Sequence, residues 1–489
     1  MTIDPRAAAR RDNLFASSVF SVAMAVVGLA AILIGGGAVY YRANPSVLDE
    51  APRRGAHRLH LARLPAGFAA PIHASLEADL AKVDGTRYVE HHRLLKLYLM
   101  LTEPEHIDPR WAAGQLTRRW VQLQREGAQL SPSELRELAR PFASAYVDQL
   151  VAGRLAPHTA DHALVERARS ALRNVSEEER YHALFVDVLV DERIDESADP
   201  TPDNLVFPSI SLPHIFRDRP EVLQHIESRA YLETGRYPEV QGAYTERGMR
   251  ELTYLLQEGK IGLENEGWVA SSPIDDTKFQ RQMANVVTRY ENEYTRQWLT
   301  FFDDLRIPPP TDSTAALNRY RVLTAEPHPV HRLLGVLANE TQFEATGTEE
   351  AEPLHVIDTL RGQPLRPTHR RMCGYHLCNP VFDLDLGSIR HQLGRISLRF
   401  RDTVRFVRDT GEPSAGSSDM SVYAERLRRL RASVASITRD KGTISLHEHT
   451  QMFEETRLAV EKQLVGYNGV AKRILRPLLV SPLEISAVR

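Results

Sequence analysis

Apolar residues form one uncharged run near the start of the sequence, from Phe15 to Tyr41. About 20 apolar residues are enough to cross the hydrocarbon core of a bilayer, and a backbone at that depth must be helical because no water can bond its polar groups. A cleaved signal peptide would have a shorter apolar region, of about 7–15 residues, with a small-x-small cleavage site behind it. The ending Gly-Gly-Ala-Val-Tyr-Tyr fits that pattern poorly. The sequence therefore predicts a retained transmembrane helix over residues 15–41.

Arginines flank this segment on both sides. Before it lie Arg6, Arg10 and Arg11, and after it lie Arg42, Arg53 and Arg54. Positive charge is denser in front of the segment, and basic residues favour the cytoplasmic side of a membrane. We therefore expect a cytoplasmic tail over residues 1–14, a single-pass anchor in a bacterial inner membrane, and the bulk of the chain in the periplasm.

After residue 42, apolar residues recur at steps of three and four almost everywhere, without a run of alternating strands bounded by tight turns. This spacing predicts a mainly α fold, in which a multi-helix body follows the single N-terminal transmembrane helix. The clearest helix runs from about Asp276 to Leu305. Its apolar positions are Phe279, Met283, Val286, Val287, Tyr290, Tyr294, Trp298, Phe301, Phe302 and Leu305. They form one continuous face, which we expect to lie in a core.

Capping residues signal several helix starts. They occur at Asp108-Pro109, at Ser131-Pro132-Ser133-Glu134 and at Ser176-Glu177-Glu178-Glu179. Aspartate and serine are favoured N-caps, proline fits the first helical position, and a glutamate three residues after the serine completes a capping box. We expect a helix to begin at each of these places.

Polar segments rich in proline, glycine and serine separate the predicted helices, at residues 195–204, 308–310, 345–367 and 411–419. The third segment is the longest and suggests a domain boundary. We therefore expect a larger helical domain over residues 42–344, a linker over residues 345–380 that carries Cys373 and Cys378, and a smaller helical domain over residues 381–489.

Composition limits the kind of protein. A chain of 489 residues with 42% hydrophobic residues is long and apolar enough for two or three packed domains. Its net charge of −3 gives no overall attraction to nucleic acid or to an anionic membrane surface. With only two cysteines, the chain is neither a disulfide-rich scaffold nor a four-cysteine metal module.

Two groups of residues are candidates for metal chemistry. Cys373, His376 and Cys378 offer three ligands within six residues, although a tetrahedral zinc site would need a fourth ligand from elsewhere. In an oxidising periplasm the two cysteines are instead a candidate disulfide, with two free thiols as the other alternative. His447 and His449 are two residues apart and so diverge on a helix, which favours a solvated pair over a zinc site.

Other candidate chemistry is weaker. No phosphate-binding loop of the Gly-x-x-x-x-Gly-Lys-Ser/Thr type occurs, and no nucleophile has a recognisable base beside it. A basic cluster consists of Arg426, Arg428, Arg429 and Arg431. It contains no aromatic residue and has Glu425 beside it, which favours a solvated helix face over a nucleic-acid site. We expect no catalytic residue, cofactor, metal or nucleic-acid partner.

The segment Tyr88–Asp108 resembles the most recognisable segment of the IcmF/TssM family, the large inner-membrane component of type VI secretion systems. The matching residues are Leu95, Lys96, Tyr98, Leu99, Met100, Leu101 and Pro104, while His92 stands where the family has a tyrosine. Further similar segments follow in the family's order, at residues 164–172, 243–249, 290–305, 328–341 and 471–479. Read physically, the motif residues form an apolar helix that must pack on its neighbours, with Lys96 as its one charged interruption.

The resemblance implies a structural rather than catalytic role. Family members usually carry two earlier transmembrane helices with a cytoplasmic nucleotide-binding-like domain, and they continue into a β-rich domain that meets an outer-membrane lipoprotein. This chain is expected to correspond to the anchor and the periplasmic core only. It would then be a subunit of the secretion membrane complex that forms part of the periplasmic channel wall, in homo- and hetero-oligomers with the other subunits.

Two alternatives stay open at this point. One is a membrane-anchored periplasmic metal-dependent enzyme that uses the cysteine and histidine groups at residues 373–378 or 447–449. The other is a stand-alone periplasmic adaptor that has left secretion altogether.

Overall fold

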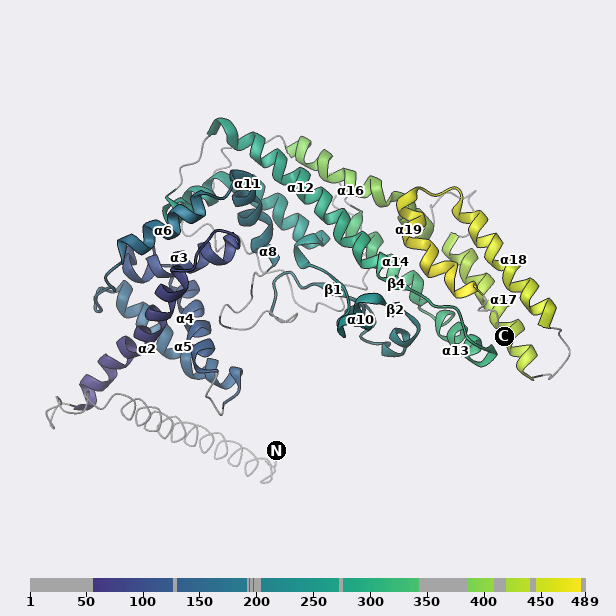
Figure 1. Cartoon of the computed structure of the whole chain (residues 1–489), viewed down its shortest axis with the longest axis horizontal. Helices are drawn as coiled ribbons and strands as arrows, with labels where there is room; N and C mark the ends of the chain where they lie inside the picture. Colours follow the sequence, from purple (N-terminus) through teal and green to yellow (C-terminus); the bar gives the residue numbers. More distant parts are fainter. Residues whose placement is uncertain are drawn as a thin grey trace, which may run out of the picture. The chain divides into compact units, whose positions relative to one another are not determined.

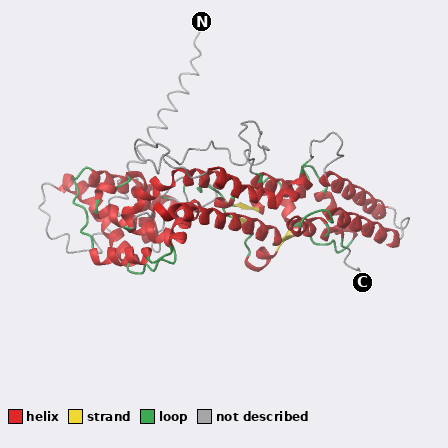
Figure 2. Cartoon of the chain, turned by 90° about the horizontal axis from the view of Figure 1, so that it is seen from above, coloured by secondary structure: helices red, strands yellow, loops and turns green. Residues whose placement is uncertain are grey.

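The chain is built mainly from α-helices, as the computed structural model in Figures 1 and 2 shows. The structure describes residues 56–125, 130–190, 193, 197, 204–271, 276–342, 386–408, 419–439 and 446–484. The predicted transmembrane helix at residues 15–41 and the predicted linker at residues 345–380 lie outside these residues. Of the helices in the described ranges, none combines the length and apolar character that a membrane span requires. Contacts divide the chain into two units, residues 1–70 and residues 71–489.

A group of helices begins the second unit. Its elements are α2 (Ala56–Leu80), whose last turns belong to the unit, α3 (Tyr88–Thr102), η2 (Pro104–His106), α4 (Pro109–Gln124), α5 (Pro132–Val151) and α6 (His162–Arg173). The predicted start of α4 is confirmed, because the Asp108 carboxylate accepts hydrogen bonds from two backbone N–H groups of the first turn, both at 3.0 Å. The capping box of α5 is confirmed as well. Ser131 N–H donates to the Glu134 carboxylate at 2.8 Å, and Glu134 N–H donates to the Ser131 hydroxyl at 3.4 Å.

Short elements connect this group to the long central helices. They are α7 (Glu177–His182), the π-helix η3 (Ala183–Asp187), α8 (Val188–Val190), β1 (Ile210–Ser211), α9 (Leu212–Ile215), η4 (Pro220–His225), β2 (Glu227–Ser228), α10 (Arg229–Thr234), β3 (Glu239–Val240) and η5 (Gly242–Tyr244). The helix start predicted at Ser176 is confirmed, because its hydroxyl accepts a hydrogen bond from Glu179 N–H at 3.2 Å. Packing around η5 is close enough to require glycine, since a Cβ at Gly242 would lie 1.7 Å from the Phe207 carbonyl oxygen.

Strands are few in the described ranges and pair in twos. β1 pairs with β3, and β2 pairs with β4 (Leu305–Arg306), both in the antiparallel sense. The predicted helix over residues 276–305 is α12 (Asp276–Asp303), which ends two residues early because Leu305 pairs with Ser228 in the second ladder.

The long helices α11 (Glu246–Ala270) and α12 carry much of the core. Every apolar position predicted on the face of α12 is at most 2% exposed, which confirms the assignment of this face to the core. Its aromatic rings also contact one another, with Trp298 and Phe302 stacked at 6.4 Å between centroids. Aromatic pairs of this kind add to the stability that burial alone provides.

The remaining helices pack onto this core. They are α13 (Ser313–Leu323), α14 (Pro329–Thr341), α16 (Leu386–Val407), α17 (Asp419–Arg439), α18 (Leu446–Leu464), α19 (Gly469–Leu479) and η7 (Ser481–Leu483). Figure 1 shows α16 along α12, and one hydrophobic cluster contains residues from Tyr181 to Leu483. The C-terminal end is bonded back to earlier helices, because Tyr320 OH donates to the Pro482 carbonyl at 2.8 Å. The division into domains at residues 42–344 and 381–489 stays a prediction.

Candidate functional site

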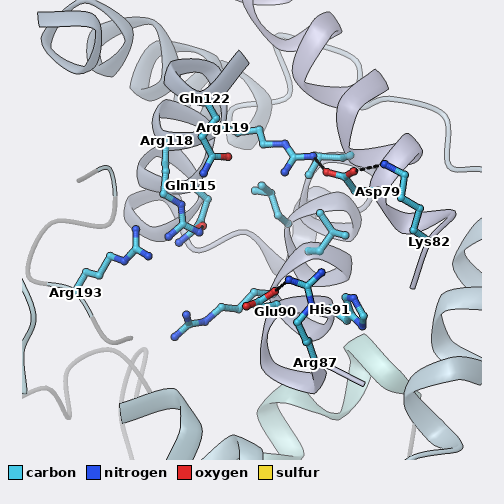
Figure 3. A pocket seen from close by; sticks show the side chains of 14 residues that line it. Asp79, Lys82, Arg87, Glu90, His91, Gln115, Arg118, Arg119, Gln122 and Arg193 are labelled. Atoms are coloured by element: carbon cyan, nitrogen blue, oxygen red, sulfur yellow. Dashed lines mark hydrogen bonds and ion pairs between the residues drawn. The ribbon is translucent and has the colours of Figure 1, made fainter. Parts of the chain in front are cut away.

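A basic pocket of about 460 Å³ opens beside helices α2, α3 and α4 (Figure 3). Among the described residues, the cationic side chains that line it are Lys82, Arg87, Arg93, Arg118, Arg119 and Arg193. The acidic residues of the lining are Asp79 and Glu90. Leucines 76, 94 and 97 add an apolar part, and Gln115 and Gln122 add amides. Because cations outnumber carboxylates in the lining, the pocket favours a negatively charged ligand.

Ion pairs fix several of the charged side chains. Arg119 on α4 reaches α2, where it donates to the Ser75 hydroxyl at 2.9 Å and to the Asp79 carboxylate. Lys82 donates to the same carboxylate at 3.0 Å, and Arg87 lies 2.8 Å from Glu90. Burial raises the pKa of Asp79, but the hydrogen bonds from Arg119 and Lys82 outweigh it and hold the pKa below its ordinary value. Asp79 is therefore ionised at neutral pH and ties α4 to α2.

The family-motif helix α3 forms one wall of this pocket. Five of its motif residues are at most 2% exposed: Leu95, Tyr98, Leu99, Met100 and Leu101. Lys96 is half-buried, and its Nζ lies 5.0 Å from the centroid of the Trp111 ring on α4. This cation–π contact accounts for a charge within an otherwise apolar run. Arg93, Leu94 and Leu97 of the same helix line the pocket.

The Tyr98 hydroxyl connects three parts of the chain. It donates to the Glu77 carboxylate on α2 at 3.2 Å and accepts from Asp161 N–H at 3.0 Å. The rings of His73 and His158 stack on one another beside it, 4.1 Å apart. Burial is the main cause that lowers the pKa of both histidines. The buried side of α3 thus holds its neighbours, while the other side faces the pocket.

A second charged cluster lies between α7, η5 and α12. Glu293 accepts from Tyr244 OH at 2.7 Å and from Arg289 Nε at 3.0 Å, and its other contact is His182 Nε2 at 2.8 Å. His182 Nδ1 lies 3.4 Å from Asp187. Burial lowers the pKa of His182, but its interactions with the carboxylates of Asp187 and Glu293 outweigh it and raise the pKa overall. Burial raises the pKa of Glu293, but its hydrogen bonds, first those from His182 and Tyr244, lower it to about 2. The cluster connects helices through buried charge.

Several residues singled out in the sequence lie outside the described part of the chain. Cys373, His376 and Cys378 are among them, so the disulfide stays a prediction. His447 and His449 fall within the backbone of α18, but their side chains are outside the described set. Among the residues that the structure describes, no group of three or more His, Cys, Asp or Glu is placed to hold a metal ion.

The arginine cluster of α17 is engaged by other parts of the fold. Arg428 pairs with Glu326 at 2.7 Å, Arg431 donates to Thr324 at 3.1 Å, and Arg426 donates to Gln463 at 3.0 Å. Arg429 pairs with Glu425 on its own helix at 3.0 Å. These contacts give the cluster a structural role between α17 and its neighbours.

The basic pocket itself was not predicted from the sequence. Its cations lie in the loop between α2 and α3, on α3 and α4, and at Arg193, so they are separated by up to 111 positions. No local spacing connects them. The one available signal was the family resemblance of α3, which pointed to the helix but not to its charged side.

Fold and site together define a class of protein: a mainly α-helical chain with a large aromatic core, ion pairs between helices and a basic pocket on its most recognisable helix. The chain belongs to the IcmF-related family, described as intracellular multiplication and human macrophage-killing, whose model matches residues 50–342.

A curated relative is the type VI secretion system component TssM1 of Pseudomonas aeruginosa. It is 27% identical over 252 residues, which cover 51% of this chain and 21% of the relative. The matched region thus spans about a fifth of the relative's length. No solved structure matches the chain. Family membership agrees with the resemblance that the motif of α3 carried.

Proposed function

We propose that this chain is a structural subunit of a type VI secretion membrane complex. The observation that carries the proposal is the match of the IcmF-related family over residues 50–342, supported by similarity to a secretion component. In this proposal residues 15–41 anchor the chain in the inner membrane. The helices after the anchor stand in the periplasm and form part of a channel wall together with other subunits.

The way in which the helices are held together supports a role in assembly. Arg473 on α19 pairs with Asp303 at the end of α12, with Nε 2.6 Å from the carboxylate. Arg332 on α14 pairs with Asp218 at 2.7 Å. These ion pairs join segments distant in sequence, and one hydrophobic cluster has members from Tyr181 to Leu483. A wall subunit needs such a framework, because its neighbours must find their contact surfaces in fixed positions.

Co-purification from cells with an active secretion system tests the proposal. The tagged chain is extracted in a mild detergent, sized, and analysed by mass spectrometry. We expect it in a large assembly with other secretion membrane subunits. An unrelated single-pass inner-membrane protein with the same tag is the control. A chain that runs alone or only with copies of itself would contradict membership of the complex.

Metal analysis separates this role from catalysis. If the chain is a structural subunit, we expect the purified chain to contain no stoichiometric metal. Stoichiometric zinc, together with a hydrolytic activity lost on chelation, would instead favour the enzyme alternative that residues 373–378 suggested.

A further inference from the structure

The basic pocket lies against α3, the helix that carries the family motif. We propose that it binds an acidic peptide segment of a neighbouring subunit, an inference that rests on the proposed function. The pocket would then be a docking site through which the motif helix contacts a partner.

Charge is the first reason. Among the residues that the structure describes, six cationic side chains and two carboxylates line the pocket, and this excess of positive charge favours an anionic ligand. Five of the six cations are arginines, whose planar guanidinium groups bind carboxylates in a bidentate manner. Figure 3 shows these side chains reaching in from several sides. A chain with several spaced carboxylates can meet more of these groups than one small anion can.

The remaining lining is the second reason. The leucines at 76, 94 and 97 offer apolar contact, and Gln122 offers an amide that suits a peptide backbone, whereas the amide oxygen of the buried Gln115 accepts a hydrogen bond from Arg118 at 2.5 Å. A volume of about 460 Å³ lies in the range of ligand sites in proteins and accommodates a few side chains. Charge, apolar surface and amides together match an acidic peptide better than inorganic phosphate, which uses only the charge.

Pre-organisation is the third reason. Arg119 is held by the Ser75 carbonyl at 3.1 Å, by the Ser75 hydroxyl and by Asp79, so α2 and α4 are fixed relative to one another. A site whose frame is already ordered loses less conformational entropy when it binds. Arg119 is therefore part of the frame and is left unchanged in the experiment.

The experiment measures binding of a fluorescein-labelled hexaglutamate peptide to the full chain in mild detergent by fluorescence anisotropy. We expect saturable binding that weakens as salt is raised, and no binding of hexaglutamine. The double variant Arg93→Gln/Arg118→Gln should weaken binding about tenfold or more. Lys82→Gln should give a smaller loss. Because the Lys82 side chain is 75% exposed, this variant keeps the fold even if the double variant does not.

A matched control removes the same charge elsewhere. The double variant Arg250→Gln/Arg429→Gln alters side chains that are 72% and 78% exposed and do not line the pocket. It should leave hexaglutamate binding within about twofold of the original chain, because exposed ion pairs contribute little. Equal weakening by the control and the pocket variants would overturn the proposal, as would an absence of hexaglutamate binding at low salt.

Pyrophosphate provides a second control on the ligand class. If it binds to the pocket and hexaglutamate does not, the site takes a small anion and the peptide proposal is wrong. These results are independent of co-purification. If the chain is found in the complex but does not bind the peptide, only the docking-site proposal is refuted. If the chain binds the peptide but is not found in the complex, only the proposed function is refuted.

Discussion

Large side chains of α12 are both buried and hydrogen-bonded. The indole N–H of Trp298 donates to the Tyr244 carbonyl at 3.1 Å, and Tyr290 OH donates to the Ala243 carbonyl at 2.7 Å. A buried N–H or O–H without a partner is costly, so each of these residues requires a fitting volume and a placed acceptor. Individual residues of this helix are therefore hard to replace.

Trp298→Ala should lower the free energy of unfolding by about 3–5 kcal/mol, because Trp298 is 0% exposed and its removal leaves a cavity. Trp298→Phe retains most of the volume and should cost less. Urea denaturation of the full chain, followed by circular dichroism, measures both. A fully stable Trp298→Ala variant that had merely lost a partner would show that this face binds rather than packs.

The His182 cluster should make stability depend on pH. The pKa of His182 in the folded chain is raised above the ordinary 6.5. The contribution of His182 to stability is therefore fully present below pH 6.5 and is lost as the pH rises through the folded-state pKa. The stability difference between the original chain and His182→Gln should therefore be larger at about pH 5.5 than at about pH 8.5. His331→Gln, at an exposed position, is the control. A difference that grows with pH would contradict the assignment.

At the scale of elements, a buried carboxylate joins two helices. Glu291 on α12 is 1% exposed, and it lies 3.1 Å from Arg399 and 3.5 Å from Arg395 on α16. The arginine side chains are 38% and 53% exposed, so water reaches them from the other side. The Glu291 carboxylate therefore relies on the two arginines to stabilise its charge, whereas water can stabilise the charges of the arginines.

This inequality predicts an order of effects. Arg395→Leu/Arg399→Leu leaves a buried, uncompensated carboxylate and should cost about 3–5 kcal/mol. Glu291→Gln leaves arginines that water can solvate, and should cost about 1–3 kcal/mol. Chemical denaturation of the full chain gives both values. The control replaces Arg428 and Arg429 by leucine, which removes their exposed ion pairs with Glu326 and Glu425. It should lower the free energy of unfolding by less than about 1 kcal/mol per ion pair. The reverse order would mean that Glu291 is solvated.

At the scale of the whole molecule, the prediction concerns topology. The uncharged run over residues 15–41 and the arginines in front of it predict an anchor with the body in the periplasm. Protease added to spheroplasts should degrade the body, whereas in intact cells the body should stay whole and membrane-bound. A cytoplasmic marker protein checks that the spheroplasts are closed. A body that resists protease in closed spheroplasts would mean that the orientation is inverted.

Local sequence by itself determined the mainly α-helical fold and the starts of several helices. Ser131 and Glu134 specify the start of α5 because their mutual hydrogen bonds span only three residues. The apolar face of α12 follows from a spacing of three and four residues, which places its nine apolar positions on one side of any helix. The motif of α3 also gave the family, because an ordered set of residue types is preserved in the sequence whatever the packing.

Only the tertiary structure decided which charges meet. In the sequence Glu291 is one polar position of an amphipathic helix, yet α16, which starts 95 residues later, covers it with two arginines. The basic pocket arises in the same way, since Lys82, Arg118 and Arg193 become neighbours only when α2 and α4 pack beside α3. The reason is physical: periodicity and capping depend on contacts within about one turn, whereas the meeting of distant side chains depends on how whole helices pack.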